Sequence, residues 1–498
     1  MPPHSARGQQ SSGDDTTAGA TEPSVELVAL NANGAKPNVA SQQDAVEVAV
    51  PTTKKTQEPS KSELRDQAIK ALFGLEVSYT KSWPGTLAVC IYLEEQFKDL
   101  LDDSFSVIWK IMGREKPQES FQVWYWCLAL LKILRQVNEC SLDSVYRGLL
   151  EQSGIQVKEI NDLEKARTLQ AIFAGICWMS LALEPKLLQD TTSSPSRFGL
   201  SCKSILARDE SVTTVQLKQY SSRPTNKLFR GFHELLAHVS GEQTSHTPIS
   251  GTIYESSINF DSLYTIGRLR VKWTDTMAAH LHWNQEDHTV SIFRFPSFCA
   301  ATIQASQFIP TVAEVQGELL PSESYVDVPR PVKPHALHRE LMLTYRLLFG
   351  QSVRSRKLVQ DLLIQEKKAD RVVDPLLERL CTLPLSRSWV AKSLSRRNHL
   401  DLPAALFPQS TISTSSVFME SDSYSAQHDF PVFGLRLLEL QKYNLRQQPS
   451  RARDLWRDRR NPLQWYTFWA VIWVGGITIV LAVLQLAVGI AQLYFAPG

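Results

Sequence analysis

The most constraining feature of the sequence is a long apolar stretch near its C-terminus, Trp465–Leu493, which contains no charged residue. A helix needs about 20 apolar residues to cross the roughly 30 Å hydrocarbon core of a membrane, because lipid offers the backbone no hydrogen-bond partner. A cluster of arginines, here called the arginine collar, precedes it: Arg451, Arg453, Arg457, Arg459 and Arg460. The contrast predicts a C-terminal single transmembrane helix over residues 465–493.

Charge also predicts the orientation of this helix. The positive-inside rule keeps the arginine collar, and with it the large N-terminal part of the chain, in the cytosol. The N-terminus, MPPHSARGQQSSGDDTTAGA, lacks the apolar run of a secretory signal. The few residues after Leu493 are uncharged. This favours a tail-anchored, single-pass protein that inserts after synthesis, in the endoplasmic reticulum or another endomembrane.

Two sets of residues are candidates for contacts within the membrane. The arginine collar is expected to hold anionic headgroups, at about 1 kcal/mol for each residue, and Trp465, Tyr466 and Trp469 are expected in the interfacial belt. Small and polar residues, here called the seam, recur at spacings of three and four: Gly475, Thr478, Ala482, Gln485, Gly489 and Gln492. Such residues let helices approach closely in lipid. The seam predicts a homo-oligomer or pairing with another membrane protein, unless these residues are simply tolerated in a single span.

Composition limits the classes of function open to the chain. Its 498 residues suggest roughly two to three folded units at about 150 residues each, and 43% hydrophobic residues can supply their cores. A net charge of +2 argues against a generally basic nucleic-acid binder. No two of the cysteines are spaced as CxxC, which favours buried thiols in a reducing compartment.

The expected fold class is mostly α with a small antiparallel β module (α+β). Residues 1–60 contain no aromatic residue and are expected to form a disordered tail. Residues 61–190 are expected to form a helical bundle, with helices at about 87–112, 119–137, 141–152 and 159–188 and a capping box at Ser60 and Glu63. The uncharged Thr168–Leu183 is expected to be a buried core helix, since it is short for a second membrane span.

Residues 191–305 are expected to hold a linker and then the α+β module. Leu269, Val271 and Trp273 alternate with basic residues, which predicts a half-buried strand over Gly267–Trp273 with a cationic outer face. A β-hairpin is expected from Ala279–Trp283 and Thr289–Phe295, so that at least three antiparallel strands lie here, with a fourth at about 252–260.

The remaining chain is expected to be mainly helical. Residues 306–334 are a proline-rich connection, and residues 335–408 are helical with an interruption at Gly350. Residues 409–430 are a Ser/Thr-rich loop, expected to be flexible. Residues 431–464 contain a last helix and the arginine collar.

Histidines offer weak candidates for a metal site. His280 and His282 alternate on the expected hairpin, with Glu286 and His288 in the adjoining turn, so that their side chains could converge on a transition metal. The favoured alternative is a polar strand face in solvent, and no metal is predicted.

The sequence contains none of the common catalytic motifs. GxSxG, GxxxxGK[ST], GxGxxG and the kinase HRD and DFG sets do not occur. No catalytic residue, cofactor-binding residue or cofactor is therefore predicted. Because a triad is set by space and not by order, an enzyme is disfavoured but stays open.

Several blocks resemble a family of uncharacterised membrane proteins from filamentous fungi. They are VKWTD (271–275), SIFRFP (291–296), LHREL (337–341), YRLLFGQS (345–352) and RDLWRDRRNPLQWYTFWAV (453–471). The resemblance covers residues 60–498. It implies membrane placement and architecture, and it transfers no site.

The sequence thus favours a membrane-anchored, cytosol-facing binding or scaffolding protein whose partners are membrane lipids and no nucleic acid. The competing hypothesis is a membrane-tethered enzyme, or an accessory protein of a lipid or secondary-metabolite pathway, with a site near the hairpin.

Overall fold

The computed structural model describes most of the chain after the N-terminal tail. The described residues are 59–74, 85–136, 140–154, 159–187, 197–203, 211–230, 232, 251–305, 309–317, 335–384, 402–413, 417–447 and 462–495. They all belong to a unit that runs from Glu58 to Gly498, separate from Met1–Gln57. The predicted disordered tail, apart from its last residues, and the arginine collar lie outside the described residues.

The first helix, α1 (Lys61–Phe73), begins where the sequence predicts. The Ser60 side chain accepts a hydrogen bond from the Glu63 backbone N–H, and the Glu63 carboxylate accepts one from the Ser60 N–H at 2.8 Å. This reciprocal capping box satisfies two N–H groups that the helix leaves unpaired. Gly74, at φ 62°, ends the helix in the left-handed conformation that glycine adopts without strain.

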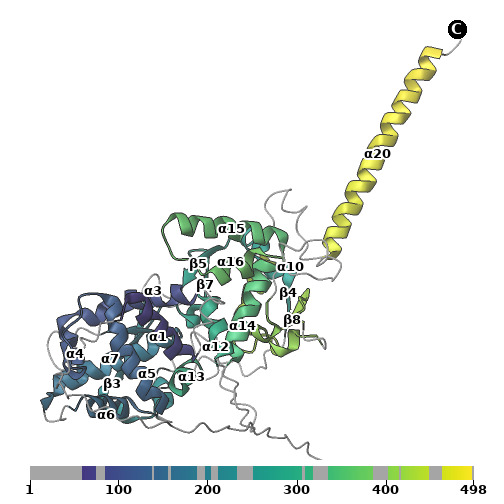
Figure 1. Ribbon diagram of the computed structural model, residues 1–498. Helices are drawn as coiled ribbons and strands as arrows, with labels where there is room; N and C mark the ends of the chain where they lie inside the picture. The colour runs from purple at the N-terminus through teal and green to yellow at the C-terminus, as the bar shows by residue number, and fades with distance from the viewer. Residues whose placement is uncertain are drawn as a thin grey trace, which may run out of the picture. The chain divides into compact units, whose positions relative to one another are not determined.

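The described residues that precede the C-terminal apolar helix, 59–447, are here called the body. The helices that follow α1 form its N-terminal part (Figure 1). They are α3 (Thr86–Gln96), α4 (Ser106–Ile111), α5 (Trp124–Gln136), α6 (Leu142–Ser153) and α7 (Asp162–Ser180). The single helix expected at 87–112 is divided by the 3₁₀ turns η1 (Phe97–Leu101) and η2 (Asp103–Phe105), and η3 (Ser120–Val123) precedes α5. The break lies at Asp102, whose backbone is extended and whose side chain caps η2.

Helix α7 resolves the question raised by its uncharged sequence. Every residue from Thr168 to Ser180 is buried, so this stretch is a core helix of the body, as expected. The cysteines among the described side chains are also buried and free: Cys90, Cys127, Cys140, Cys177, Cys299 and Cys381.

A three-stranded antiparallel sheet occupies much of the region predicted as a linker, and that prediction is wrong. Its strands, in spatial order, are β1 (Glu184–Lys186), β2 (Arg197–Lys203) and β3 (Ser211–Leu217). Phe198 and Leu200 are buried on one side of β2. The Ser and Thr content suggested a linker, but the β-branched run in β3 favours a strand. The turn η5 (Lys218–Ser222) and α8 (Thr225–Arg230) follow.

A second sheet contains the predicted hairpin in shortened form. Its order is β5 (Arg270–Thr274), β7 (Thr289–Phe293) and β6 (Trp283–Asn284). Arg270 and Lys272 are exposed and Val271 is half-buried, which confirms the cationic outer face of β5. β6 and β7 are antiparallel. β5 and β7 are parallel, so the expectation of three antiparallel strands is wrong.

The chain between β5 and β6 explains this difference. Met277–Ala279 form a 3₁₀ turn (η6), and Leu281 adopts φ 58°, which ends any extended run at the expected strand Ala279–Trp283. The alanines there also have weak strand preference. The chain instead crosses to the far side of β7 before β6 forms.

The predicted fourth strand exists but belongs to another sheet. β4 (Thr252–Tyr254) pairs with β8 (Ser423–Ser425), which lies in the Ser/Thr-rich segment expected to be a flexible loop. Tyr424 pairs with Ile253 and is buried. Two short helices, α10 (Glu255–Ile258) and α11 (Phe260–Thr265), follow β4.

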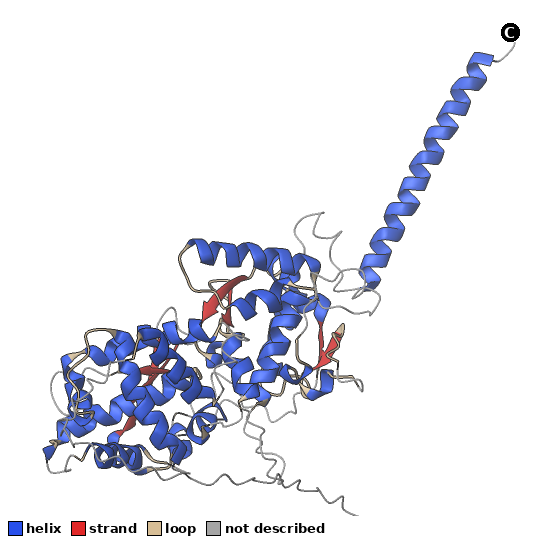
Figure 2. Ribbon diagram, in the orientation of Figure 1, coloured by secondary structure: helices blue, strands red, loops and turns tan. Residues whose placement is uncertain are grey.

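Helices make up most of the remaining body, as Figure 2 shows. They are α12 (Pro296–Gln304), α13 (Pro310–Gly317), α14 (Ala336–Tyr345), α15 (Val353–Lys368), α16 (Pro375–Thr382), η8 (Ala404–Leu406), η9 (Gln409–Thr411) and α18 (Gly434–Arg446). Helix α13 lies within the proline-rich connection. A π-helical turn, Arg346–Gly350 (η7), separates α14 from α15, in agreement with the interruption expected at Gly350.

Buried side chains join the early and late helices in one hydrophobic core. The ring centroids of Phe73 and Phe298 are 5.5 Å apart, and those of Tyr92 and Phe295 are 5.2 Å apart. At Gly85, a Cβ would lie 2.1 Å from the Asp374 carboxylate, so only glycine fits there. Residues expected to form a bundle of their own therefore share their core with α12 and α16.

Helix α20 (Pro462–Phe495) contains the predicted transmembrane segment. Residues Tyr466–Gln492 are the one stretch of described helix long and apolar enough to cross a membrane, and none of the apolar window is buried within the protein. The fold class predicted from the sequence, mostly α with small sheets and one C-terminal apolar helix, is confirmed.

Candidate functional site: a buried polar cluster on α14

Helix α14 and the π-turn after it carry an unusual concentration of buried polar side chains. His338, Glu340, Thr344 and Arg346 are each at most 1% exposed. Single π-turns within helices are rare and often occur at functional sites. These residues and their partners, here called the α14 cluster, are therefore the first candidate for a functional site.

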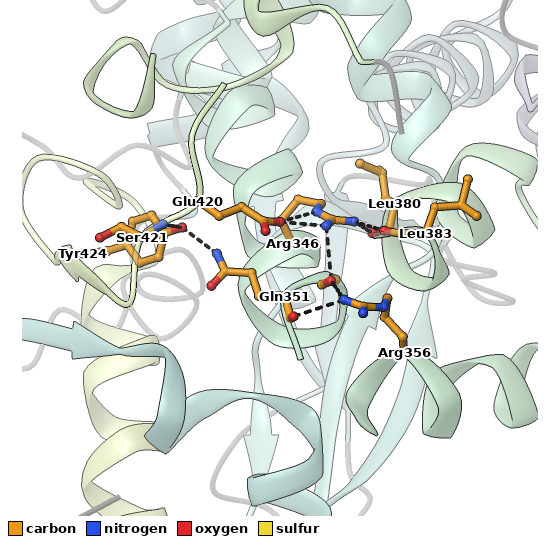
Figure 3. Close-up of polar contacts among 9 residues, drawn as sticks. Arg346, Gln351, Arg356, Leu380, Leu383, Glu420, Ser421 and Tyr424 are labelled. Carbon is orange, nitrogen blue, oxygen red and sulfur yellow. Dashed lines mark hydrogen bonds and ion pairs between the residues drawn. The ribbon is translucent and has the colours of Figure 1, made fainter. Parts of the chain in front are cut away.

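The most strongly bonded member is Arg346, shown in Figure 3. Its Nε and Nη2 donate to Glu420 Oε1 at 2.9 and 2.7 Å, and the two side chains are 0% and 3% exposed. Nη1 donates to the carbonyl oxygens of Leu380 and Leu383, and Nη2 to that of Gly350. All five N–H groups of the guanidinium are thus paired. The arrangement ties the π-turn to α16 and to the segment before β8.

A second set of bonds extends this region toward β8. Gln351 Nε2 donates to the hydroxyl of Tyr424 at 2.5 Å, and that oxygen also accepts from the Ser421 N–H at 2.9 Å. Arg356 Nη1 donates to the carbonyl oxygens of Gly350 and Gln351 at 2.7 and 3.1 Å. The carbonyls that the π-turn leaves without a helical partner are satisfied in this way.

Glu340 joins α14 to the start of α18. Its carboxylate accepts from the backbone N–H groups of Val432, at 3.0 Å, and Phe433, where the positive end of the α18 dipole lies. Burial raises the pKa of Glu340 to about 8, although these bonds and the nearby Arg436 oppose the shift. Arg436 donates to the carbonyl oxygens of Ala278 and His280.

His280 is a core residue and uses both ring nitrogens within the protein. Nδ1 accepts from the Phe293 N–H at 3.1 Å, and Nε2 lies 2.8 Å from the Thr344 hydroxyl. That hydroxyl donates to the Leu341 carbonyl, so Nε2 is the protonated nitrogen. Burial and Arg436 hold the pKa of His280 well below its usual value. The imidazole is neutral and fixed in one tautomer.

The other candidate histidines lie apart from this arrangement. His282 is half-buried, and burial lowers its pKa to about 4. His288 lies in the exposed β6–β7 turn with φ 51°, and its Nδ1 is 3.3 Å from the Tyr443 hydroxyl. Among the described residues, no group of three His, Cys, Asp or Glu side chains is arranged to hold a metal ion. The structure does not bring His280, His282 and His288 together.

Further buried bonds connect α14 and its neighbours to the rest of the core. His338 Nε2 lies 3.0 Å from Gln316 Oε1, and Gln316 Nε2 donates to the Ser180 carbonyl at 2.9 Å. Asp374 accepts from both the N–H and the hydroxyl of Ser297, at 2.7 and 2.6 Å. Burial raises the pKa of Asp374 to about 6. These bonds link helices that are far apart in sequence.

The residues predicted for membrane contact lie mainly in α20. Tyr466 and Trp469 lie in its first part, and the arginine collar lies outside the described residues. At 3.6 residues per turn, the seam residues Gly475, Thr478, Ala482, Gln485, Gly489 and Gln492 occupy a sector of about 100°. The Thr478 hydroxyl donates to the Val474 carbonyl at 2.8 Å, within its own helix.

Sequence reasoning missed the charged members of the α14 cluster. Glu340 and Arg346 lie in the blocks LHREL and YRLLFGQS, where they interrupt apolar residues of a helical pattern. A charge embedded in an apolar face is a signal of a buried pair, because isolated charges are costly in a core. The groups that bond them, Glu420 for Arg346 and the Val432 and Phe433 N–H groups for Glu340, follow from tertiary structure alone.

The chemistry open to the α14 cluster is limited by its burial. Each of its ionisable groups is bonded to other groups of the protein and shielded from solvent. The cluster fixes the relative positions of α14, α16, α18 and β8, and it is an architectural element of the body.

Compared with known proteins, the chain matches no protein-family model, no curated protein and no solved structure.

Proposed function

We propose that this chain is a membrane-anchored binding or scaffolding protein that holds a rigid folded body at a membrane surface. The observation that carries the proposal is helix α20. Its apolar segment of 27 residues is unburied and is about 40 Å long at 1.5 Å per residue, against a hydrocarbon core of about 30 Å. Exposure of so much apolar surface to water is unfavourable, whereas lipid accommodates it.

The proposed orientation places the body in the cytosol. Arg451, Arg453, Arg457, Arg459 and Arg460 precede α20 and hold the cytosolic headgroups, in accord with the positive-inside rule. The proposed membrane is that of the endoplasmic reticulum or another endomembrane. We also propose that the chain is related to the family of membrane proteins from filamentous fungi. The sequence blocks that resemble this family lie in β5, β7, α14 and the π-turn.

The state of the buried ionisable groups favours a binding protein over a tethered enzyme. Shifted pKa values cluster at catalytic sites, and Glu340 and His280 have such values. Their atoms, however, bond to backbone groups and to Thr344 within the core. These shifts therefore follow from structural burial. A body whose helices are joined by these buried hydrogen bonds presents a fixed surface to partners.

The seam supplies a proposed partner within the membrane. Gln485 and Gln492 lie on the same sector of α20, and a buried amide pair contributes about 0.6–2 kcal/mol across a helix interface in lipid. We propose that α20 pairs through this sector, with a second copy or with another membrane protein. Crosslinking in membranes tests this: Gln485→Leu/Gln492→Leu lowers the yield of the oligomer, and an unchanged yield contradicts pairing through the seam.

Extraction tests the membrane placement. The full-length chain is expected to pellet with carbonate-washed membranes, and Val474→Arg/Leu481→Arg to release it, because each arginine at the centre of a span costs about 2.5–3.5 kcal/mol. The matched control is Lys70→Arg/Lys132→Arg on exposed positions of the body, which leaves the chain in the pellet. A full-length chain found in the supernatant contradicts the proposal.

Protease treatment of intact microsomes tests the orientation. Digestion of the body is expected, and full protection contradicts a cytosolic location. Purification of the full-length chain then separates the two classes of function. A defined protein that co-purifies in fixed ratio with metal-free chain supports the scaffold, whereas stoichiometric zinc or iron supports the enzyme.

A further inference from the structure

The outward face of α15 (Val353–Lys368) is exposed to solvent along the length of the helix. Ser355, Val359 and Leu363 are buried at spacings of four, and they attach the helix to the body. The opposite side, here called the α15 face, lies in solvent and comprises Val353, Lys357, Gln360, Ile364, Lys367 and Lys368. At 1.5 Å per residue the helix is about 24 Å long.

The α15 face combines exposed apolar residues with lysines. Val353 is 61% exposed and Ile364 is 42% exposed. Lys357 and Lys368 form no ion pair within the described part of the chain, whereas Lys367 pairs with Glu378 at 2.8 Å. Apolar side chains next to free lysines on one helix face are typical of helices that lie in a membrane interface.

Acidic groups near α15 leave the net charge of this surface positive. Asp361 is exposed on the same side of α15, one helical turn after Lys357, and offsets part of its charge. Glu366 is bonded to Arg371 at 3.0 Å, and Asp261 lies 3.7 Å from Arg354. Lys357 and Lys368 form no ion pair among the described residues and outnumber Asp361, so this surface keeps a positive charge. An anionic surface complements them.

Hydrogen bonds hold α15 in place on the body, so its conformational entropy changes little when its outer face makes a contact. The Asp261 N–H donates to Ser355 Oγ at 2.9 Å, near the start of α15. Arg356 donates to two carbonyls of the π-turn. A preformed face avoids the ordering cost that weakens binding by flexible segments.

The connection to α20 brings the α15 face within reach of the membrane. Helix α11 holds the start of α15 through Asp261, and it holds the end of α18 through Ser262, whose hydroxyl accepts from Asn444 Nδ2 at 2.8 Å. α18 ends at Arg446 and α20 begins at Pro462. Residues 447–461 span at most roughly 55 Å at full extension. Such a tether makes a weak surface contact intramolecular and raises its effective concentration.

We propose that the α15 face binds the anionic lipid headgroups of the membrane that holds α20. Lys357 and Lys368 contact lipid phosphates, and Val353 and Ile364 enter the boundary between headgroups and acyl chains. This proposal rests on the proposed membrane anchoring. A lipid surface is favoured over an acidic protein because the tether supplies the membrane at high local concentration and the apolar residues lie along a single convex helix.

A nitroxide label measures this contact in the full-length chain. The label is attached to Ile364→Cys with Cys202 replaced by serine, since the other described cysteines are buried. The chain is reconstituted into phosphatidylcholine vesicles with or without phosphatidylserine. Collision of the label with oxygen and with a water-soluble nickel chelate reports whether it lies in lipid or in water. With phosphatidylserine, the label is expected to be accessible to oxygen and shielded from nickel.

Matched variants separate headgroup charge from general effects. Each lysine near an anionic surface contributes about 1 kcal/mol, so Lys357→Gln/Lys368→Gln lowers the ratio of lipid-contacting to water-exposed label about 25-fold. Lys70→Gln/Lys132→Gln, on exposed positions of α1 and α5, leaves it unchanged. A label that stays accessible to nickel in a carbonate-resistant chain overturns this inference alone. Equal contact with and without phosphatidylserine overturns it as well. A chain that carbonate releases overturns the proposed function, and the inference with it.

Discussion

Neutralising Glu420 perturbs the α14 cluster at its most strongly bonded point. Glu420→Gln keeps the shape of the side chain and one oxygen that accepts hydrogen bonds, but it removes the negative charge beside Arg346. The guanidinium is 0% exposed. It would then keep its positive charge in the core with neutral acceptors only: the amide oxygen at position 420 and the carbonyls of Leu380, Leu383 and Gly350.

The expected cost is a large fraction of the stability of a typical domain. Removing one partner of a buried ion pair costs about 3–5 kcal/mol, against a total of about 5–15 kcal/mol for a native domain. Because Glu420 lies just before β8, the first consequence is local opening of residues 417–425. A free energy of this size corresponds to opening about 10²–10⁴ times more frequent.

Hydrogen exchange measures the opening directly. The backbone amides of residues 417–425 are expected to exchange about 10²–10⁴ times faster in Glu420→Gln than in the unmodified full-length chain. Glu378→Gln is the matched control, because Glu378 pairs with Lys367 while their side chains are 42% and 48% exposed. Exposed pairs contribute at most about 1 kcal/mol, so the control changes exchange no more than about fivefold.

One result would refute the reasoning. If the exchange rates of residues 417–425 change as little in Glu420→Gln as in the control, burial of the Arg346 charge does not depend on Glu420. The ion pair would then contribute no more than a surface pair, in spite of its burial.

Two other perturbations test different parts of the body. The pKa of Glu340 is raised from 4.5 to about 8 in the folded chain, so the folded state binds the extra proton, and the stability this contributes is present below about pH 4.5 and lost as the pH rises to 8. Glu340 should therefore contribute a fall of about 1.4 kcal/mol per pH unit to the free energy of unfolding in that window. In urea titrations, the unfolding free energy of the unmodified chain minus that of Glu340→Gln should fall with pH by this amount, and a difference that does not change with pH would contradict the shift. At Gly434, a Cβ would lie 2.3 Å from a backbone carbonyl oxygen, so Gly434→Ala should cost about 1–3 kcal/mol and lower the Tm. Gly317→Ala, where a Cβ meets no atom of the described residues within 4 Å, is the control, and equal Tm values for the two variants would reject the steric argument.

Features that depend on neighbouring residues could be predicted from the sequence. The capping box at Ser60 and Glu63 involves residues three apart, and the apolar runs of α7 and α20 are continuous. The interruption at Gly350 is likewise a local signal. In each case the energy that determines the structure comes from a short segment, so its pattern is visible without knowledge of the fold.

Features that depend on distant partners could not be predicted. The parallel pairing of β5 with β7 depends on the turn at Leu281, and the pairing of β4 with β8 joins segments about 170 residues apart. The same holds for the candidate site. Glu340 and Arg346 are conspicuous as charges within apolar blocks, but nothing in the sequence assigns them the start of α18 and Glu420. The histidines at 280, 282 and 288 suggested convergence because the hairpin was expected to be longer than it is.

The position of α18 in the core has a consequence for biosynthesis. Leu437, Leu440 and Arg436 are buried, so the body is incomplete until residues 434–446 have left the ribosome. The next forty-nine residues, through Phe495, follow within roughly 2–10 s at ordinary rates of translation. The apolar helix is therefore synthesised during the same seconds in which the rest of the polypeptide reaches its native state. A mutation that slows this maturation would leave both the unfinished core and the hydrophobic segment exposed to quality control at once.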